Sequence, residues 1–212
     1  YQYTDSGSSE VRYSVQPITT KPSIAGNLEN RPVIIVGTGK YLTVSDKTDR
    51  SVQSIYGLED RSYFNPDSVV APSCDSLTCL RNATELPLYA MRMSGLISDD
   101  PAYEVFRDIL RPTSNGKVIE YDSKLYAGWV VDMNYAAGEK VVVNSTVQDR
   151  HVYITTMVPS DDPCEGGGTG HLYDLNVVTG WFSKSPAESQ LHSDRLMSRA
   201  TTAYSRPSSD GR

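Results

Sequence analysis

Residues 31–46 read RPVIIVGTGKYLTVSD, and the interpretation of the whole chain starts from them. A run of β-branched residues leads into glycines and a lysine, as a strand leads into a phosphate-binding loop. A P-loop requires a glycine five residues before Gly39 and a serine or threonine after Lys40. The chain has Ile34 and Tyr41 at those positions. The residues that follow also predict a strand or turn instead of the helix that would attract an anion, so the sequence argues against nucleotide binding.

Composition limits the classes of protein to which the chain can belong. It has 212 residues with a net charge of −6 and a pI of about 5.1, which disfavours a nucleic-acid partner because such proteins usually carry a basic patch. No apolar run approaches the roughly 20 residues of a membrane helix. The 14 tyrosines indicate strands that are wet on one face. The chain begins at Tyr1 without a recognisable signal peptide, so we expect a mature or trimmed product.

Apolar runs separated by turn residues predict antiparallel strands over 17–60 and 116–180. The irregular residues 61–115 are interpreted as a partly helical insertion that decorates this β scaffold. Within it, DDPAYEVFRDILR (99–111) predicts a helix, because an aspartate can cap it, proline fits the first turn and apolar residues recur on one face. Residues 181–212 are rich in serine and arginine and predict a polar tail or linker.

An internal repeat offers an explanation for the glycines. Both halves show a strand, a turn, a central apolar strand, a loop and a third strand of the form x-Y-x-L-[EN], seen in SIYGLED and HLYDLN. The second copy, GHLYDLNVVTG, resembles the pattern G-x-L-Y-A-L-D-x-x-T-G that marks a blade of quinoprotein-type β-propellers. Glycines there allow close backbone packing and tight turns. We therefore interpret five residues as structural parts of blades: Gly37, Gly39, Tyr41, Gly168 and Gly170.

The expected fold is all-β, with antiparallel blades of a partial β-propeller in residues 1–180. A propeller has about four to eight blades, each on the order of 40 residues. This chain can hold about two or three such blades, so it is expected to be one arc of a larger ring.

Two longer blocks carry a family resemblance. Residues 33–60 resemble the segment V-x-V-G-T-G-[KR]-Y-L-x-x-S-D-x-x-[DT]-x-x-x-Q-S-x-Y-G-[IL]-x-D of type IV pilus tip-associated adhesins, the PilY family. Residues 138–180 are similar to the following part of those proteins, with G-E-[RK]-V and then D-P-C-x-x-G-G-T. The blocks occur in the family's order and, with the flanking strands, cover about half of the chain.

The resemblance implies a role for the chain. It implies part of a C-terminal, non-enzymatic propeller of a secreted protein that is exported through the periplasm and seated on minor pilins at the pilus tip. The family's role would be pilus assembly, adhesion to host or abiotic surfaces, and twitching motility. The family's calcium loop has no match in this chain, so no metal or cofactor is expected in this segment.

Two alternatives stay open. A dehydrogenase that uses pyrroloquinoline quinone has the same type of blade, and its calcium ligands and general-base aspartate could lie in blades outside this chain. An outer-membrane assembly scaffold is also built on a propeller, but its blades lack the D-P-C-x-x-G-G-T loop.

The remaining candidate residues carry little ligand chemistry. Cys74 and Cys79 do not have the spacing of a zinc site, and we predict that they form a disulfide in an oxidising compartment. Cys164 has no evident partner. The aspartates at 46, 49, 161 and 162 are interpreted as turn residues. No ligand spacing joins the three histidines, which are His151, His171 and His192.

Overall fold

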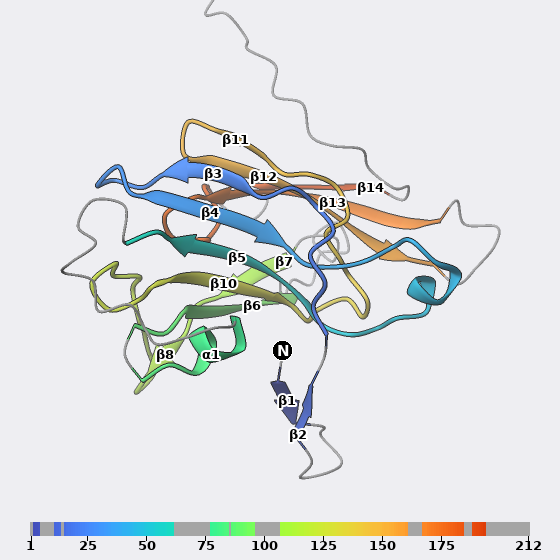
Figure 1. Cartoon of the computed structure of the whole chain (residues 1–212), viewed down its shortest axis with the longest axis horizontal. Coiled ribbons are helices and arrows are strands. Elements are labelled where there is room, and N and C mark those ends of the chain that lie inside the picture. The colour runs from blue at the N-terminus through green and yellow to red at the C-terminus, as the bar shows by residue number, and fades with distance from the viewer. Residues whose placement is uncertain are drawn as a thin grey trace, which may run out of the picture.

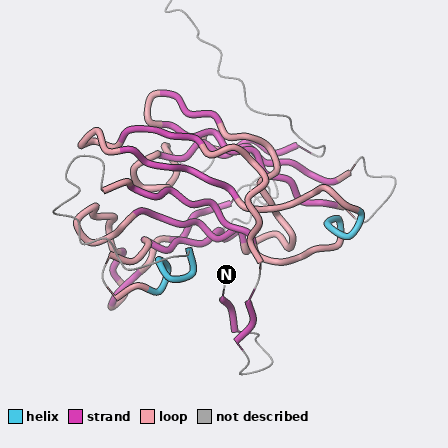
Figure 2. Tube along the Cα trace, viewed as in Figure 1, coloured by secondary structure: helices cyan, strands magenta, loops and turns pink. Residues whose placement is uncertain are grey.

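Strands dominate the computed structural model, and they form two large sheets (Figure 1). The structure describes residues 2–4, 11–13, 15–61, 77–84, 86–95, 107–160, 167–184 and 188–193. Helical structure in these residues is limited to the 3₁₀ turn η1 (Val44–Lys47) and the short helix α1 (Leu77–Asn82), drawn in cyan in Figure 2. The all-β prediction is therefore confirmed.

One sheet has six strands in the order β3-β4-β5-β10-β6-β7. Its strands are β3 (Ser23–Gly26), β4 (Pro32–Gly37), β5 (Gln53–Glu59), β10 (Gly128–Met133), β6 (Tyr89–Gly95) and β7 (Arg107–Leu110). The first three make the antiparallel meander that the sequence predicts over 17–60. The pair β10–β6 is parallel, which an antiparallel propeller blade would not contain.

The other sheet has four antiparallel strands in chain order. They are β11 (Thr146–Gln148), β12 (His151–Pro159), β13 (Gly168–Asn176) and β14 (Gln190–Ser193). This is the arrangement expected of a single blade. Two further ribbons are small: β1 (Gln2–Thr4) pairs with β2 (Val11–Tyr13), and β8 (Thr113–Ser114) pairs with β9 (Lys117–Val118). No closed propeller is seen in the described residues.

The main core lies between the two large sheets. Side chains on one face of β12 and β13, including Ile154 and Tyr173, share a buried cluster with Ile35, Ile55 and Trp129 of the six-stranded sheet. The outer face of the six-stranded sheet buries a second cluster under α1, made of Val36, Tyr56, Leu88 and Val130 with Leu77 and Leu80 packed against it. Two-sided burial explains why β10 is apolar at almost every position.

Polar side chains join the sheets along both pairs of edges. At one edge the hydroxyls of Ser23 and Ser145 lie 2.8 Å apart, beside β3 and β11. At the other edge the side-chain amide of Gln190 on β14 bonds both backbone groups of Arg107 on β7, with a distance of 2.9 Å from the Arg107 N–H to Gln190 Oε1. These bonds satisfy edge groups that would otherwise need water or another strand.

The expectation that residues 61–115 decorate a finished scaffold is wrong. They supply β6 and β7, which extend the six-stranded sheet beyond β10. The predicted helix over 99–111 is also wrong where the structure describes it, because Arg107–Leu110 is a strand. Ile109 is 2% exposed and Leu110 is 38% exposed, so they point to opposite faces and do not share one. Residues 96–106 lie outside the described part.

The predicted tail over 181–212 is wrong for its first part. Phe182 is buried in the main core, and β14 pairs with β13. The segment SQLHS shows no apolar alternation, so its strand depends on backbone pairing that a pattern cannot predict. Residues 194–212 lie outside the described part.

Candidate functional site

The glycine-rich loop after β4 is a junction between the two sheets. The N–H of Thr38 donates to Ser54 O at 2.9 Å, and the N–H of Gly39 donates to Pro17 O at 2.8 Å. A Cβ added to Gly37 would lie 2.5 Å from Val141 Cβ. Gly39 has φ of 141°, and a Cβ there would lie 2.5 Å from Lys140 Cβ. The amides are thus used within the protein, and the glycines let the chain at 140–141 approach the loop.

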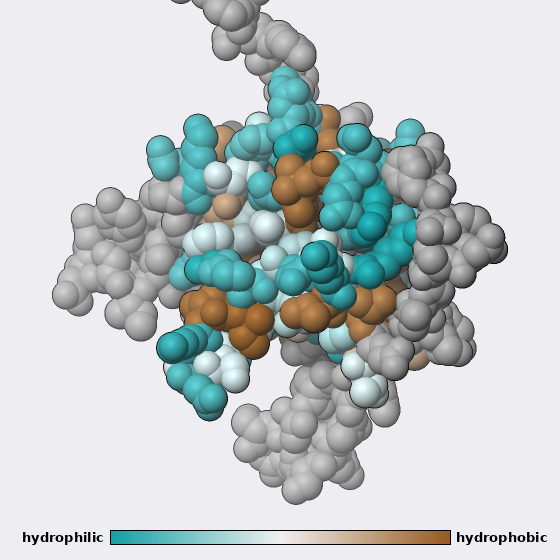
Figure 3. All heavy atoms as spheres, turned by 90° about the vertical axis from the view of Figure 1, so that its left-hand side faces the viewer, coloured by the Kyte–Doolittle hydropathy of each residue, from teal (hydrophilic) through white to brown (hydrophobic). Residues whose placement is uncertain are grey.

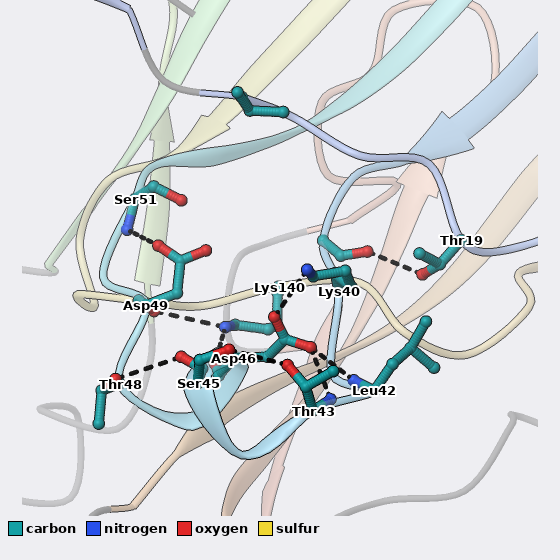
Figure 4. Close-up of polar contacts among 12 residues, drawn as sticks. Thr19, Lys40, Leu42, Thr43, Ser45, Asp46, Thr48, Asp49, Ser51 and Lys140 are labelled. Atoms are coloured by element: carbon teal, nitrogen blue, oxygen red, sulfur yellow. Dashed lines mark hydrogen bonds and ion pairs between the residues drawn. The ribbon is translucent and has the colours of Figure 1, made fainter.

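Asp46 holds the shape of the following turn (Figure 4). Its Oδ2 accepts hydrogen bonds from the N–H groups of Leu42 and Thr43, each at 2.8 Å, and its Oδ1 lies 3.0 Å from Lys40 Nζ. Burial alone would raise the pKa of Asp46, but the hydrogen bonds from Leu42, Lys40 and Thr43 outweigh it and hold the pKa well below its usual range. Asp46 is therefore a charged internal clamp.

Lys140 connects this turn to the four-stranded sheet. Its side chain is 1% exposed, and Nζ donates to the backbone oxygens of Asp46 at 2.8 Å and Asp49 at 3.3 Å (Figure 4). Its backbone N–H and C=O both pair with Met157 of β12. Burial lowers the pKa of the Lys140 ammonium, while the carboxylates of Asp49 and Asp46 partly oppose that shift. The loop interior is therefore occupied by the protein's own cation.

The turn presents two aliphatic side chains on its outer side. Leu42 is 77% exposed and Val44 is 89% exposed, although the backbone that carries them is held by Asp46. The arrangement can contact an apolar surface, but its donors and acceptors are committed to one another. The sequence indicated Asp46 only as a turn residue and did not point to Lys140, whose place directly before the apolar run VVV in GEKVVV was the available signal.

A second buried network links β7 to the four-stranded sheet. Arg107 pairs with Glu139 and donates to Tyr173 Oη at 2.6 Å. Tyr173 and Thr156 donate to Glu139 Oε1 at 2.9 and 2.5 Å. Burial raises the pKa of Tyr173 well above its usual value, and the Glu139 carboxylate adds to that effect. All four groups face one another between the sheets, so the network is a structural connection.

A third network fixes α1 to the outer face of the six-stranded sheet. Arg81 Nη2 lies 2.5 Å from Asp132 Oδ2, and Ser54 donates to Asp132 Oδ1 at 2.6 Å. Tyr56 donates to Gln16 Oε1 at 2.5 Å and receives a bond from Arg81 at 3.2 Å.

The other residues that the sequence predicts to be structural parts of blades lie in strands or loops. Gly168, at the start of β13, has φ of 126°, and a Cβ there would lie 2.1 Å from Val158 O. Gly170 pairs with Met157 in the same sheet, and Tyr41 is half-buried in the loop. Cys79 is disulfide-bonded, but Cys74 and Cys164 lie outside the described residues, so the Cys74–Cys79 pairing stays a prediction.

The histidines lie on the four-stranded sheet, where His171 on β13 pairs in register with His192 on β14. His151 Nδ1 lies 2.8 Å from Asp174 Oδ1, and His171 is buried and stacked on Tyr173. Within the described residues, no group of three His, Cys, Asp or Glu side chains could hold a metal ion. None of the helices described is long and apolar enough to cross a membrane. Asp161 and Asp162 are not among the described residues.

Comparison with known proteins gives a consistent set of relatives. No family model matches the chain. The chain is 30% identical over 176 residues to the type IV pilus biogenesis factor PilY1 of Pseudomonas aeruginosa strain UCBPP-PA14, covering 78% of this chain and 15% of that protein. It is 27% identical over 180 residues to a PilY1 homolog of Xylella fastidiosa, covering 79% of this chain and 12% of that protein. The chain thus spans a small part of these relatives.

A solved structure shares the fold. The crystal structure of the Pseudomonas aeruginosa PilY1 C-terminal domain matches 85% of this chain and 34% of that chain, with a TM-score of 0.54 and 20% sequence identity.

Proposed function

Because the chain belongs to the PilY family, in the region of the PilY1 C-terminal domain, we propose that it is part of a non-enzymatic module of a type IV pilus biogenesis factor. The module would act at the cell surface or pilus tip by docking on minor pilins, and it would thereby support pilus assembly, adhesion and twitching motility. The observation that carries this proposal is the 30% identity to a pilus biogenesis factor over 78% of the chain.

The glycine-rich loop is compatible with a binding module. The amides of Thr38 and Gly39 and the charged groups of Asp46 and Lys140 are paired internally, and the side chains of Leu42 and Val44 that point outward are aliphatic. Such a surface offers apolar contact and no reactive group. We interpret the loop 40–50 as a structural feature of the module that is held in shape by Asp46 and Lys140.

Binding to purified minor pilins of the same organism tests this proposal. The 212-residue chain is immobilised, each minor pilin is passed over it, and binding is measured as a function of concentration. We expect saturable binding to at least one minor pilin and none to the major pilin. Absence of binding to every minor pilin overturns the docking proposal. The alternative dehydrogenase is examined in parallel by titrating the chain with pyrroloquinoline quinone and calcium, where tight uptake of the quinone favours the enzyme.

A further inference from the structure

Three connections from both sheets converge on one open cleft. It has a volume of about 600 Å³, within the range of ligand sites. The β3–β4 turn supplies Asn27, Leu28 and Glu29, the segment before β10 supplies 120–123 and Leu125, and the turn after β13 supplies Val178 and Thr179. Figure 3 shows the end of the molecule that carries the β3–β4 turn, where brown apolar side chains lie among teal hydrophilic ones.

The cleft exposes large aliphatic side chains. Leu28 is 67% exposed and Leu125 is 59% exposed, and both line the cleft together with the half-buried Val178. A single exposed leucine is ordinary, but two that line one hollow form an apolar surface that a partner can cover.

Carboxylates are the charged groups of the lining. Glu29, Glu120 and Asp122 line the cleft, and no lysine or arginine does. Glu29 pairs with Arg31 at 2.9 Å and Glu120 with Arg111 at 2.8 Å, but both arginines lie outside the lining. The lining therefore places carboxylate oxygens next to aliphatic side chains.

Side-chain to backbone hydrogen bonds hold each of the three connections in shape. The buried side chain of Asn27 accepts from the N–H groups of Glu29 and Arg31 at 2.9 and 2.8 Å. Asp122 accepts from Lys124 N–H at 2.8 Å, and Asn176 accepts from Val178 N–H at 2.8 Å. Because the cleft is formed before a partner arrives, binding need not order these loops first.

We propose that this cleft binds a cationic, aliphatic polypeptide segment of a protein partner. Leucine- or isoleucine-like side chains of the segment contact Leu28, Leu125 and Val178, and its lysine or arginine side chains meet the three carboxylates. Charge complementarity favours a cationic occupant. An acidic segment would place like charge against the carboxylates, and a neutral segment would leave them without an opposite charge. This inference rests on the proposed function, because it names the cleft as the surface through which the module contacts its protein partner.

A peptide probe tests the chemistry of the cleft directly. A fluorescein-labelled peptide of alternating lysine and leucine is titrated with the 212-residue chain, and anisotropy is recorded at low and high salt. The same peptide with glutamate in place of lysine is the matched probe. We expect binding of the lysine peptide, weakened by salt, and little binding of the glutamate peptide. Equal binding of both peptides overturns the proposal.

Variants locate the binding. Leu28→Ser with Leu125→Ser should weaken the lysine peptide by about tenfold or more. Glu120→Gln should weaken it less and should reduce its salt dependence. Leu191→Ser is the control, because Leu191 is 61% exposed and lies outside the cleft. Circular dichroism establishes that each variant is folded. An unchanged affinity in the double serine variant overturns the proposal.

The pilin assay separates this inference from the proposed function. If wild-type chain binds a minor pilin and the double serine variant binds it equally well, the cleft is not the contact surface and the proposed function stands. If no minor pilin binds, the proposed function fails. A wild-type dimer that the double serine variant abolishes would instead show that a second copy covers the cleft, and it would overturn the proposed occupant.

Discussion

Gly57→Ala should destabilise the protein because Trp129 leaves no space for a methyl group. The indole of Trp129 is fully buried between the sheets, and its Nε1 donates to Val177 O at 2.8 Å. A Cβ on Gly57 would lie 2.2 Å from Trp129 Cε2, and a Cβ on Gly180 would lie 2.3 Å from Trp129 Cδ2. Gly57, the partner of Trp129 on the neighbouring strand β5, and Gly180, in the turn after β13, therefore leave the space that the indole fills.

The size of the effect follows from the overlap. Ordinary contact begins at 3.4 Å, so at 2.2 Å the indole or β5 must move by 1.2 Å. The indole is hydrogen-bonded and the interior is close-packed, so the cost should reach about 3 kcal/mol, the upper part of the usual overpacking range. For a chain of this size, that corresponds to a fall in Tm of about 6–12 °C. Urea unfolding followed by tryptophan fluorescence measures it.

Gly26→Ala is the matched control, because a Cβ there meets nothing within 4 Å. Trp129→Phe provides a second background, since phenylalanine lacks Nε1 and the second ring that the new methyl group would strike. Gly57→Ala should cost markedly less in that background, as expected for residues in contact. The reasoning is refuted if Gly57→Ala is as stable as Gly26→Ala, or if its cost is the same in both backgrounds.

Other substitutions test the remaining features. Arg107→Met should lower the free energy of unfolding in urea by about 3–5 kcal/mol, because it leaves the charge of Glu139 buried without a partner. Adding Glu139→Met should recover much of that loss. Strictly additive costs of the two substitutions would contradict this expectation. Arg150→Gly should stabilise by about 1 kcal/mol, because Asp149 and Arg150 form the two-residue β11–β12 turn with φ of 49° and 66°; a thermal melt that falls would contradict it. Because the pKa of Asp46 is depressed in the folded state, its carboxylate adds stability above about pH 4, and this stability is lost as the pH falls. In Asp46→Asn the free energy of unfolding should therefore decrease less steeply below about pH 4 than in the wild type. An equally steep decrease would contradict the role of the Asp46 carboxylate in holding the turn.

Much of the sheet structure was predictable where pattern and turn chemistry agree. The run at 32–37 and the segment SIYGLED became β4 and β5, and HLYDLN lies in β13. The prediction from sequence was wrong where the same apolar residues fit both a helical and a strand pattern. In RDILR, apolar neighbours fit a helical face, yet Ile109 and Leu110 lie on opposite faces of β7. The side chain of Gln190 on β14 bonds the backbone of Arg107, which lies 83 residues earlier in the chain. No local sequence pattern contains such a contact.

The cleft was not predictable for a similar reason. Leu28, Glu120 and Val178 lie in three separate connections, and each looks like an ordinary turn residue in the sequence. Only the pairing of β3 with β4, the placement of β10 and the end of β13 bring those connections to one side of the molecule. A site that is built from separate turns in this way has no fixed residue spacing that a sequence motif could detect.

Charge distinguishes the two ends of the molecule. In Figure 1 the η1 loop and the β3–β4 turn lie at opposite ends. Near η1, four cationic side chains face two carboxylates, because Lys40, Lys47, Arg50 and Lys140 accompany Asp46 and Asp49. The cleft end carries three lining carboxylates, and Arg31 and Arg111 pair with two of them from outside the lining. Because cations exceed carboxylates near η1 and do not at the cleft end, electrostatics favour approach of a cationic partner from the cleft end before any apolar contact forms.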